Sequence, residues 1–189
     1  MVVSATLNSA PVMLYFGQEV GEDGGETPGF GKPSRTSIFD YVGVPNHQAW
    51  MNEGAFDGGQ LTAEQKKLRA YYQKILKAVH KSDAFLGPYV ENHFYNKAHT
   101  DIYDHRIFSF VRYDDKEVVL VVSNFEKDKN YNIDLKLDPS IVHLLQLEQE
   151  DYDLSDLLTN DTSKLHISEG IGHVSMDLKP LESRIFLFK

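Results

Sequence analysis

The second half of the chain is dominated by short runs in which apolar and polar residues alternate. A period of two places every second side chain on the same face of a β-strand. Turn-forming residues separate the runs, and the sequence EGIG predicts a hairpin between two of them. The runs are RIFSFVRY, EVVLVVSNF, YNIDLKL, KLHIS, HVSMDL and SRIFLF. Short strands at this spacing predict a mainly β fold, an antiparallel β-sandwich of about seven or eight strands over residues 88–189.

The first 60 residues have a different composition. They hold ten of the 13 glycines and four of the seven prolines, so this part is expected to be mostly loop. One apolar run, Pro11–Phe16, alternates little and ends at Gly17, which favours a strand buried on both faces in a parallel sheet. A buried helix segment is the alternative. The acidic run EQEDYDLSD, residues 148–156, is expected to form a solvated turn.

A long amphipathic helix is predicted between these two parts. Thr62 and Gln65 match a capping box, in which the two side chains satisfy backbone donors at a helix start. Gly87 and Pro88 end the segment. The apolar residues between these signals recur at helical spacing and form one stripe: Leu68, Tyr71, Tyr72, Ile75, Leu76 and Val79.

Composition argues against several classes of protein. The net charge of −9 argues against a nucleic-acid binder or a protein that docks on anionic lipid, and leaves neutral partners such as sugars open. The absence of cysteine excludes disulfides, thiolate metal sites and cysteine nucleophiles. No apolar stretch reaches the length of a membrane span. The apolar N-terminus lacks the basic start of a signal peptide and resembles a chain that begins in the middle of a fold, so the compartment stays open.

The glycine-rich loop after the apolar run does not match a nucleotide site. A phosphate loop needs Gly-Lys followed by Ser or Thr, but Gly31-Lys32 is followed by Pro33, and Ser34 stands where a dinucleotide fingerprint needs glycine. Histidines and aspartates gather in residues 93–105 without the spacing of a zinc site. We therefore expect surface histidines there, no metal site and no cofactor.

The motif SAPVMLYFGQEVGE carries a family resemblance. Pro11, Tyr15, Gly17 and Glu19 have the spacing Gly-x-Pro-x-x-x-Tyr-x-Gly-x-Glu, with Ser9 in place of the first glycine. This pattern resembles the eighth barrel strand of the alpha-amylase family of glycoside hydrolases. The loop RTSIFDYVGVPNHQAW, the long helix and the closing LKPLESRIFLF resemble later parts of that family in the same order. The resemblance implies that residues 1–87 are the last strand, loop and helix of a (β/α)8 barrel, and that residues 88–189 are the C-terminal β-sandwich.

The resemblance implies that this chain is the C-terminal portion of a retaining glycosidase acting on α-glucans such as starch and maltodextrin. The family's catalytic carboxylates follow barrel strands four, five and seven, which these residues do not include, so we expect no catalytic residue here. The sandwich would stabilise the barrel. Substrate contact is expected from Gln18, Glu19, Arg35 and Trp50, because guanidinium groups donate to hydroxyls and indole stacks on sugar rings. The alternatives are a structural carboxylate at Glu19 and a packing anchor at Trp50.

Two other classes stay open. A free-standing carbohydrate-binding β-sandwich would expose an aromatic ladder, with Tyr113, Phe125 and Tyr131 as possible members. An interaction domain unrelated to sugars is the third reading. The expected partner is an α-glucan or maltooligosaccharide bound through the parent's barrel, with neither nucleic acid nor membrane. Because Pro11–Phe16 lacks its sheet neighbours, we expect it to find cover on the sandwich or by self-association with another copy.

The purified chain is expected to hydrolyse neither starch nor maltotriose, because both carboxyl groups of the reaction would be supplied from outside these residues. A reducing-sugar assay with an active α-amylase as positive control measures this. Release of reducing ends that follows the chain through two purification steps would contradict the expectation.

Overall fold

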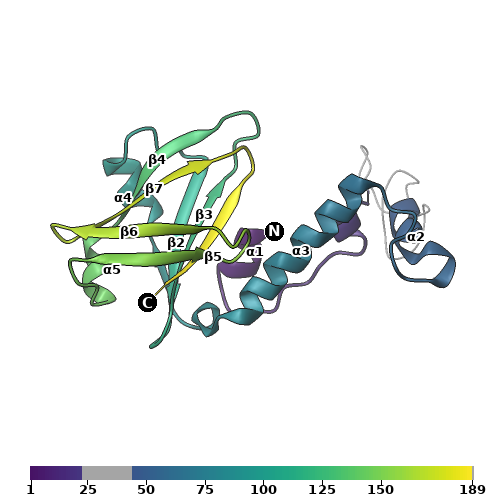
Figure 1. The fold of residues 1–189 in the computed structure, drawn as a ribbon, viewed down its shortest axis with the longest axis horizontal. Helices are drawn as coiled ribbons and strands as arrows, with labels where there is room; N and C mark the ends of the chain where they lie inside the picture. Colours follow the sequence, from purple (N-terminus) through teal and green to yellow (C-terminus); the bar gives the residue numbers. More distant parts are fainter. Residues whose placement is uncertain (23–43, 189) are drawn as a thin grey trace. The chain divides into compact units, whose positions relative to one another are not determined.

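The computed structural model describes residues 1–22 and 44–188 (Figure 1). The chain divides into two compact units, one formed by Met1–Ala10 with Ile75–Lys189 and the other by Pro11–Lys74. The assignment of residues 1–87 to a barrel stays a prediction. In the described part of the chain, no helix combines the length and apolar character needed to cross a membrane.

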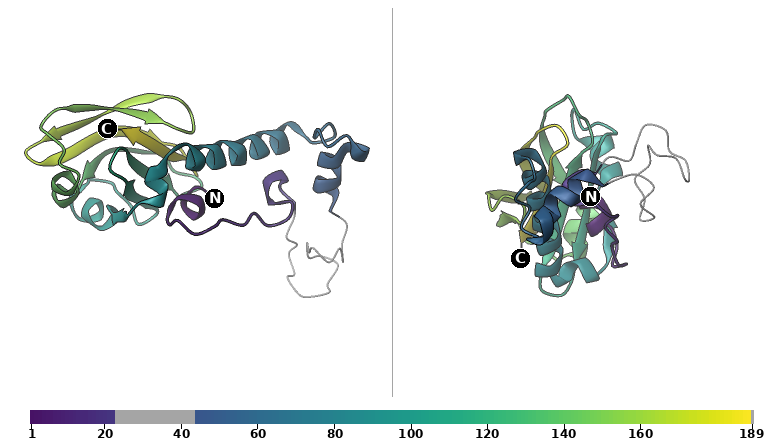
Figure 2. Two further views of the ribbon diagram at one scale, coloured as in Figure 1. Left: turned by 90° about the horizontal axis from the view of Figure 1, so that it is seen from below. Right: turned by 90° about the vertical axis from the view of Figure 1, so that its right-hand side faces the viewer.

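The larger unit contains one curled antiparallel sheet of eight strands, which confirms the predicted mainly β architecture. The strand order is β1-β2-β3-β8-β5-β6-β7-β4, and every neighbouring pair is antiparallel. Figure 2 gives two further views of the curled sheet. The strands are β1 Tyr89–Glu91, β2 Ile107–Tyr113, β3 Val118–Asn124, β4 Tyr131–Leu137, β5 Asp151–Asp156, β6 Thr162–Ser168, β7 Ile171–Leu178 and β8 Ser183–Phe188.

Alternation sets which side chains enter the core between the curled strands. In β4, Tyr131, Ile133, Leu135 and Leu137 are buried, whereas the residues between them are exposed or half-buried. Strand β3 is buried at every position, because one face lies on the core and helix α1, Val2–Thr6, packs against the strand. The continuous apolar run in β3 is therefore explained by cover on both faces.

The predicted EGIG hairpin is present between β6 and β7. Glu169 and Gly170 form a two-residue connection and have φ angles of 53° and 77°. Two successive positive φ angles match the twist of the flanking strands, and glycine adopts this conformation at little cost.

The acidic run at residues 148–156 is not the expected solvated turn, because most of it forms β5. Leu154 and Asp156 are buried in this strand. The Asp156 carboxylate accepts hydrogen bonds from Thr159 Oγ1 and Arg184 Nη1, both at 3.0 Å, so its charge is compensated inside the sheet. Because residues later in the chain compensate the buried negative charge, this acidic sequence can pair as a β-strand.

Arg112 of β2 holds together several segments that lie far apart in the sequence. Only 2% of this residue is exposed, and its guanidinium donates to four backbone carbonyls. Nε contacts the oxygen of Pro88 at 3.2 Å, Nη1 that of Thr6 at 2.9 Å, and Nη2 those of Phe85 and Gly87, both at 2.6 Å. Burial lowers the pKa of Arg112, but an arginine stays protonated.

Two buried asparagines make hydrogen bonds to the backbone at the end of the outer strand β4, on the side that faces β2. Helix α4, His93–His99, packs on both strands (Figure 1). Asn96 accepts from the Lys136 N–H at 2.8 Å and donates to the Lys136 carbonyl at 2.7 Å. Asn92 donates to the same carbonyl at 2.9 Å and accepts from the Asp138 N–H at 3.1 Å. These side chains supply the hydrogen bonds that a neighbouring strand would otherwise make.

Helices flank the sheet in the larger unit. Pro139–Leu144 forms α5, which Asp138 caps through a hydrogen bond from the Ser140 N–H. A 3₁₀ helix, η3, spans Asp83–Leu86. The short helices α4 and α5 were not predicted, because six or seven residues provide too little periodicity to detect.

The smaller unit is built from short helices around the start of α3, Ala63–Lys81. They are η1 Gln18–Val20, α2 Pro45–Met51 and η2 Asn52–Gly54. The predicted capping box is confirmed: the Thr62 N–H donates to Gln65 Oε1 at 2.9 Å, and the Gln65 N–H donates to Thr62 Oγ1 at 3.2 Å. The long helix thus begins where the sequence indicated.

The run Pro11–Phe16 is not a strand in the structure. Val12, Met13, Tyr15 and Phe16 are exposed, and the expected cover on the sandwich stays a prediction. A parallel strand obtains its backbone hydrogen bonds from neighbouring strands, and these residues have none beside them in the described sheet. Cover by a second copy of the chain remains a proposal.

Replacing Arg112 with Lys is expected to lower the free energy of unfolding of the sheet unit by about 3 kcal/mol, because a single ammonium cannot reach four separate carbonyls. Urea unfolding followed by far-UV circular dichroism measures the loss. The matched control is Arg106→Lys, since Arg106 is half exposed and pairs with Glu126 at the surface. Equal stability of the two variants would contradict the role of Arg112.

Candidate functional site

The candidate site residues in the smaller unit lie on short helices beside the start of α3. Gln18 and Glu19 form part of η1, and Trp50 lies near the end of α2. Helices η1 and α2 contact each other, so the structure brings these predicted residues into one region. Arg35 lies outside the described residues, and its predicted contact with substrate stays a prediction.

The side chain of Gln18 stabilises the turn that follows the apolar run Pro11–Phe16. Its Oε1 accepts from the Tyr15 N–H at 3.2 Å, and its Nε2 donates to the Tyr72 hydroxyl on α3 at 2.9 Å. Both ends of the side-chain amide are therefore engaged within the unit. A substrate contact by Gln18 would have to use the second N–H or the second lone pair of the amide.

Glu19 is half-buried in a turn whose shape depends on flanking glycines. Gly17 and Gly21 have φ angles of 78° and 72°, and a Cβ at Gly17 would lie 2.7 Å from the Glu22 Cβ. Gly17, the glycine of the family motif, is thus required by backbone geometry, and Gly21 also has the positive φ that favours glycine. In the described part of the chain, the Glu19 carboxylate takes part in no hydrogen bond or ion pair.

Glu22 caps helix α2, a role that the sequence did not indicate. One carboxylate oxygen, Oε2, accepts from the backbone N–H groups of Asn46 and His47, both at 3.0 Å. Asn46 Nδ2 returns a hydrogen bond to the Gly21 carbonyl at 2.8 Å. The carboxylate satisfies two orphan donors and lies at the positive end of the helix dipole. The cap and its helix are separated by more than twenty residues, so no local sequence pattern reveals the pairing.

The Trp50 side chain is surrounded by polar and aromatic groups. The Arg69 guanidinium lies over the indole, 5.0 Å from its centroid. The ring centroids of His47 and Phe56 lie 5.6 Å and 5.9 Å from that of Trp50, the second edge-on. The stacked guanidinium occupies ring surface that a sugar would use, and it supplies donors at the ring's edge. This geometry favours the packing-anchor reading of Trp50 over direct stacking on a pyranose.

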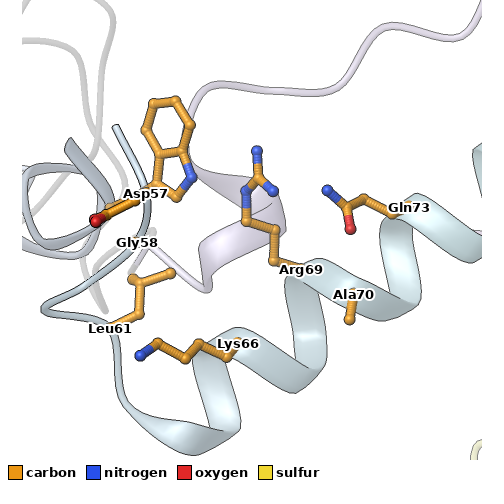
Figure 3. Close-up of a pocket in the computed structure, with 8 residues that line it drawn as sticks. Asp57, Gly58, Leu61, Lys66, Arg69, Ala70 and Gln73 are labelled. Carbon is orange, nitrogen blue, oxygen red and sulfur yellow. The ribbon is translucent and has the colours of Figure 1, made fainter. Parts of the chain in front are cut away.

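A cavity of about 140 Å³ opens beside Trp50. Figure 3 shows Arg69 and Gln73 on α3 and Leu61 before it, around this space. Arg69 Nε is buried and has no hydrogen-bond partner among the residues that the structure describes. The remaining lining residues are Asp57, Gly58, Lys66 and Ala70.

Asp57 is the carboxylate of this cavity. Its Oδ1 accepts from Asn52 Nδ2 and from the Gly59 N–H, both at 2.8 Å. These two hydrogen bonds lower the pKa of Asp57 and keep the group ionised. The lining therefore provides hydrogen-bonding groups, whereas hydrolysis of a glycosidic bond with retention needs two carboxyl groups about 5 Å apart. The cavity is suited to hold polar groups rather than to cleave a bond.

The aromatic ladder considered for a binding module is not formed. Tyr131 is 1% exposed and belongs to the core, although Phe125 is 55% exposed. A cavity of about 280 Å³ does lie on the larger unit, near β4. It is lined by His99, Thr100, Asp101, Ile102, Asn132, Asp134 and Lys136.

The histidines of residues 93–105 were all predicted to lie at the surface, but only some of them are exposed. His105 is 71% exposed, whereas His93 is half-buried and its Nδ1 lies 3.1 Å from the buried Tyr103 hydroxyl. Burial raises the pKa of Tyr103 well above its usual value. Among residues 1–22 and 44–188, no group of three or more histidines and acidic residues is arranged to hold a metal ion.

Comparison with known proteins identifies relatives of this architecture. The family model described as "Alpha amylase, C-terminal all-beta domain" matches residues 98–189. A search of the curated proteins gave no match.

Several solved structures share the fold along nearly the whole chain. The noncanonic maltogenic alpha-amylase AmyB from Thermotoga neapolitana has a TM-score of 0.62 and 15% identity, covering 99% of this chain and 34% of its own. AmyP in complex with maltose has a TM-score of 0.60 and 18% identity, with 98% and 33% covered. AmyP E221Q in complex with maltotriose has a TM-score of 0.59 and 16% identity, with 100% and 33% covered. The chain thus spans about a third of the length of these structures.

Replacing Glu22 with Ala is expected to weaken α2 by about 1 kcal/mol, because two helix N–H groups lose their acceptor. Trp50 is the single tryptophan of the chain and lies on α2, so acrylamide quenching of its fluorescence reports the loosening. The quenching constant is expected to rise in Glu22→Ala and to stay unchanged in Glu53→Ala, which removes an exposed carboxylate nearby. Unchanged quenching in both variants would contradict the capping role.

Proposed function

We propose that this chain is the C-terminal portion of an α-amylase-like glycoside hydrolase acting on α-glucans, because residues 98–189 match the family model of the alpha-amylase C-terminal all-beta domain. The substrates would be starch, maltodextrin and related maltooligosaccharides. The catalytic carboxylates would come from the part of the enzyme that precedes these residues. The proposal makes residues 88–189 a stabilising domain and residues before them the end of the catalytic barrel.

The observation that carries the proposal is the extent of the structural match. The family model covers residues 98–189, which hold strands β2 to β8, but the similar amylase structures cover 98–100% of this chain. The residues before the sheet therefore have structural counterparts in the same enzymes. A free-standing sugar-binding module would have no use for such a segment, and the buried Tyr131 removes a member of its expected ladder.

The proposed substrate class rests on the sugars bound in two of those structures and on the maltogenic character of the third protein. AmyP is described with maltose and with maltotriose, and AmyB is described as maltogenic. All three descriptions concern α-linked glucose units, so we transfer this chemistry to the present chain. In this reading, Gln18, Glu19, Arg35 and Trp50 shape one rim of the substrate cleft.

The stabilising role of the sheet unit has a physical basis in the contacts of Arg112. This one side chain binds the last carbonyl of α1 and the connection that leaves α3, so residues on both sides of the 11–74 unit are fixed to the same strand. Both ends of the proposed barrel segment would thereby be anchored. Such anchoring limits the conformational freedom of the segment between them.

The experiment that tests this function is immunoprecipitation of the native protein from lysate of the source cells, with an antibody raised against this chain. The expected result is a protein several times larger than 21.5 kDa that releases maltooligosaccharides from starch. A control precipitation with the antibody pre-absorbed on the purified chain should be inactive. A native protein of 21.5 kDa without hydrolytic activity would overturn the proposal.

A further inference from the structure

We propose that the outer face of strands β6 and β7 carries a binding site for a late first-row divalent cation such as Zn²⁺, formed by His166 and His173. The two residues are direct partners in the antiparallel pairing of β6 with β7. Directly opposed residues lie on the same face with their Cβ atoms about 4.5–5.5 Å apart. That separation lets two imidazoles share one ion, as imidazole is a preferred ligand of these metals.

Each imidazole is oriented by an aspartate on the strand beyond it. His166 Nδ1 lies 2.7 Å from Asp151 Oδ1 on β5, and His173 Nδ1 lies 2.8 Å from Asp134 Oδ2 on β4. A carboxylate accepts a hydrogen bond from Nδ1–H, which leaves the lone pair of Nε2 available. Carboxylates that fix the tautomer and raise the basicity of a histidine ligand are a common feature of metal sites.

The strand order makes the arrangement nearly symmetric. Strands β5, β6, β7 and β4 are consecutive neighbours in the sheet, so the sequence across it is aspartate, histidine, histidine, aspartate (Figure 1). Asp151 pairs directly with His166, whereas Asp134 is diagonal to His173. The residue directly opposite His173 on β4 is Lys136, whose ammonium donates to the His99 carbonyl and is thereby directed away from the histidine pair.

Both imidazoles can be reached from solvent. The side chain of His166 is 61% exposed and that of His173 is 33% exposed. Lys164, next along the same face of β6, is neutralised by Asp153 at 2.9 Å. The aspartates therefore give the histidine pair a negative surrounding that favours a dication. Two protein ligands leave the other coordination positions to water, consistent with the absence of a three-residue metal group in the described part of the chain.

The proposal is tested by titrating the tag-free chain with Zn²⁺ in an isothermal calorimeter at neutral pH. One saturable site is expected, with affinity falling at least about tenfold in His166→Ala and in His173→Ala. Asp151→Asn and Asp134→Asn keep both ligands and are expected to weaken binding about tenfold. Far-UV circular dichroism checks that each variant is folded.

The matched control is His105→Ala. His105 also forms a histidine–aspartate pair, with Asp104 at 2.6 Å, but it is no strand partner of a second histidine. Zn²⁺ affinity should be unchanged in this variant. Ni²⁺ should broaden the ring proton NMR signals of His166 and His173 at substoichiometric amounts, before those of His105. Failure to detect saturable binding, or equal losses in His105→Ala and His173→Ala, would overturn the proposal.

Discussion

The buried guanidinium of Arg112 is the contact on which the organisation of the larger unit depends. It binds carbonyls from α1, from η3 and from the two residues that follow η3, and it does so without a carboxylate partner. Each of those carbonyls ends or follows a helical turn, where backbone acceptors lack partners within the helix. A neutral side chain would leave the four carbonyls unsatisfied, and lysine would satisfy only part of them.

The curled sheet has a second constraint, at its outer strand. An open strand exposes a row of unpaired backbone groups, and β4 is such a strand. Asn92 and Asn96 bind the backbone of β4 from the neighbouring segment, and both side chains are fully buried. Amide side chains are suited to this task because one group both donates and accepts. The two asparagines thus satisfy the backbone of β4 at Lys136, where a ninth strand would otherwise pair.

The sequence allowed the strands of the sheet to be predicted where apolar residues alternate, as in β4, and where a hairpin signal is local, as at Glu169 and Gly170. It failed at β5, because the compensation of Asp156 comes from Arg184, which lies far along the chain. It also missed the capping of α2 by Glu22, since the two are separated by a long connection. Local patterns predict elements, whereas compensation between distant residues decides whether charged sequences can be buried.

The run Pro11–Phe16 shows the opposite error: a strand was predicted from the sequence, but the structure does not contain it. Its composition favours a buried strand, but burial is a property of the partners as much as of the run itself. The Gln18 amide and the flanking glycines form the turn after it without those partners, so this local geometry is independent of a sheet. The apolar side chains differ from the turn in this respect. Five of the six residues are exposed, so little of their hydrophobic free energy is gained within the described part of the chain. A run of this kind leaves an apolar surface to be covered, and this is the physical reason for the proposal that residues 1–87 are part of a larger barrel.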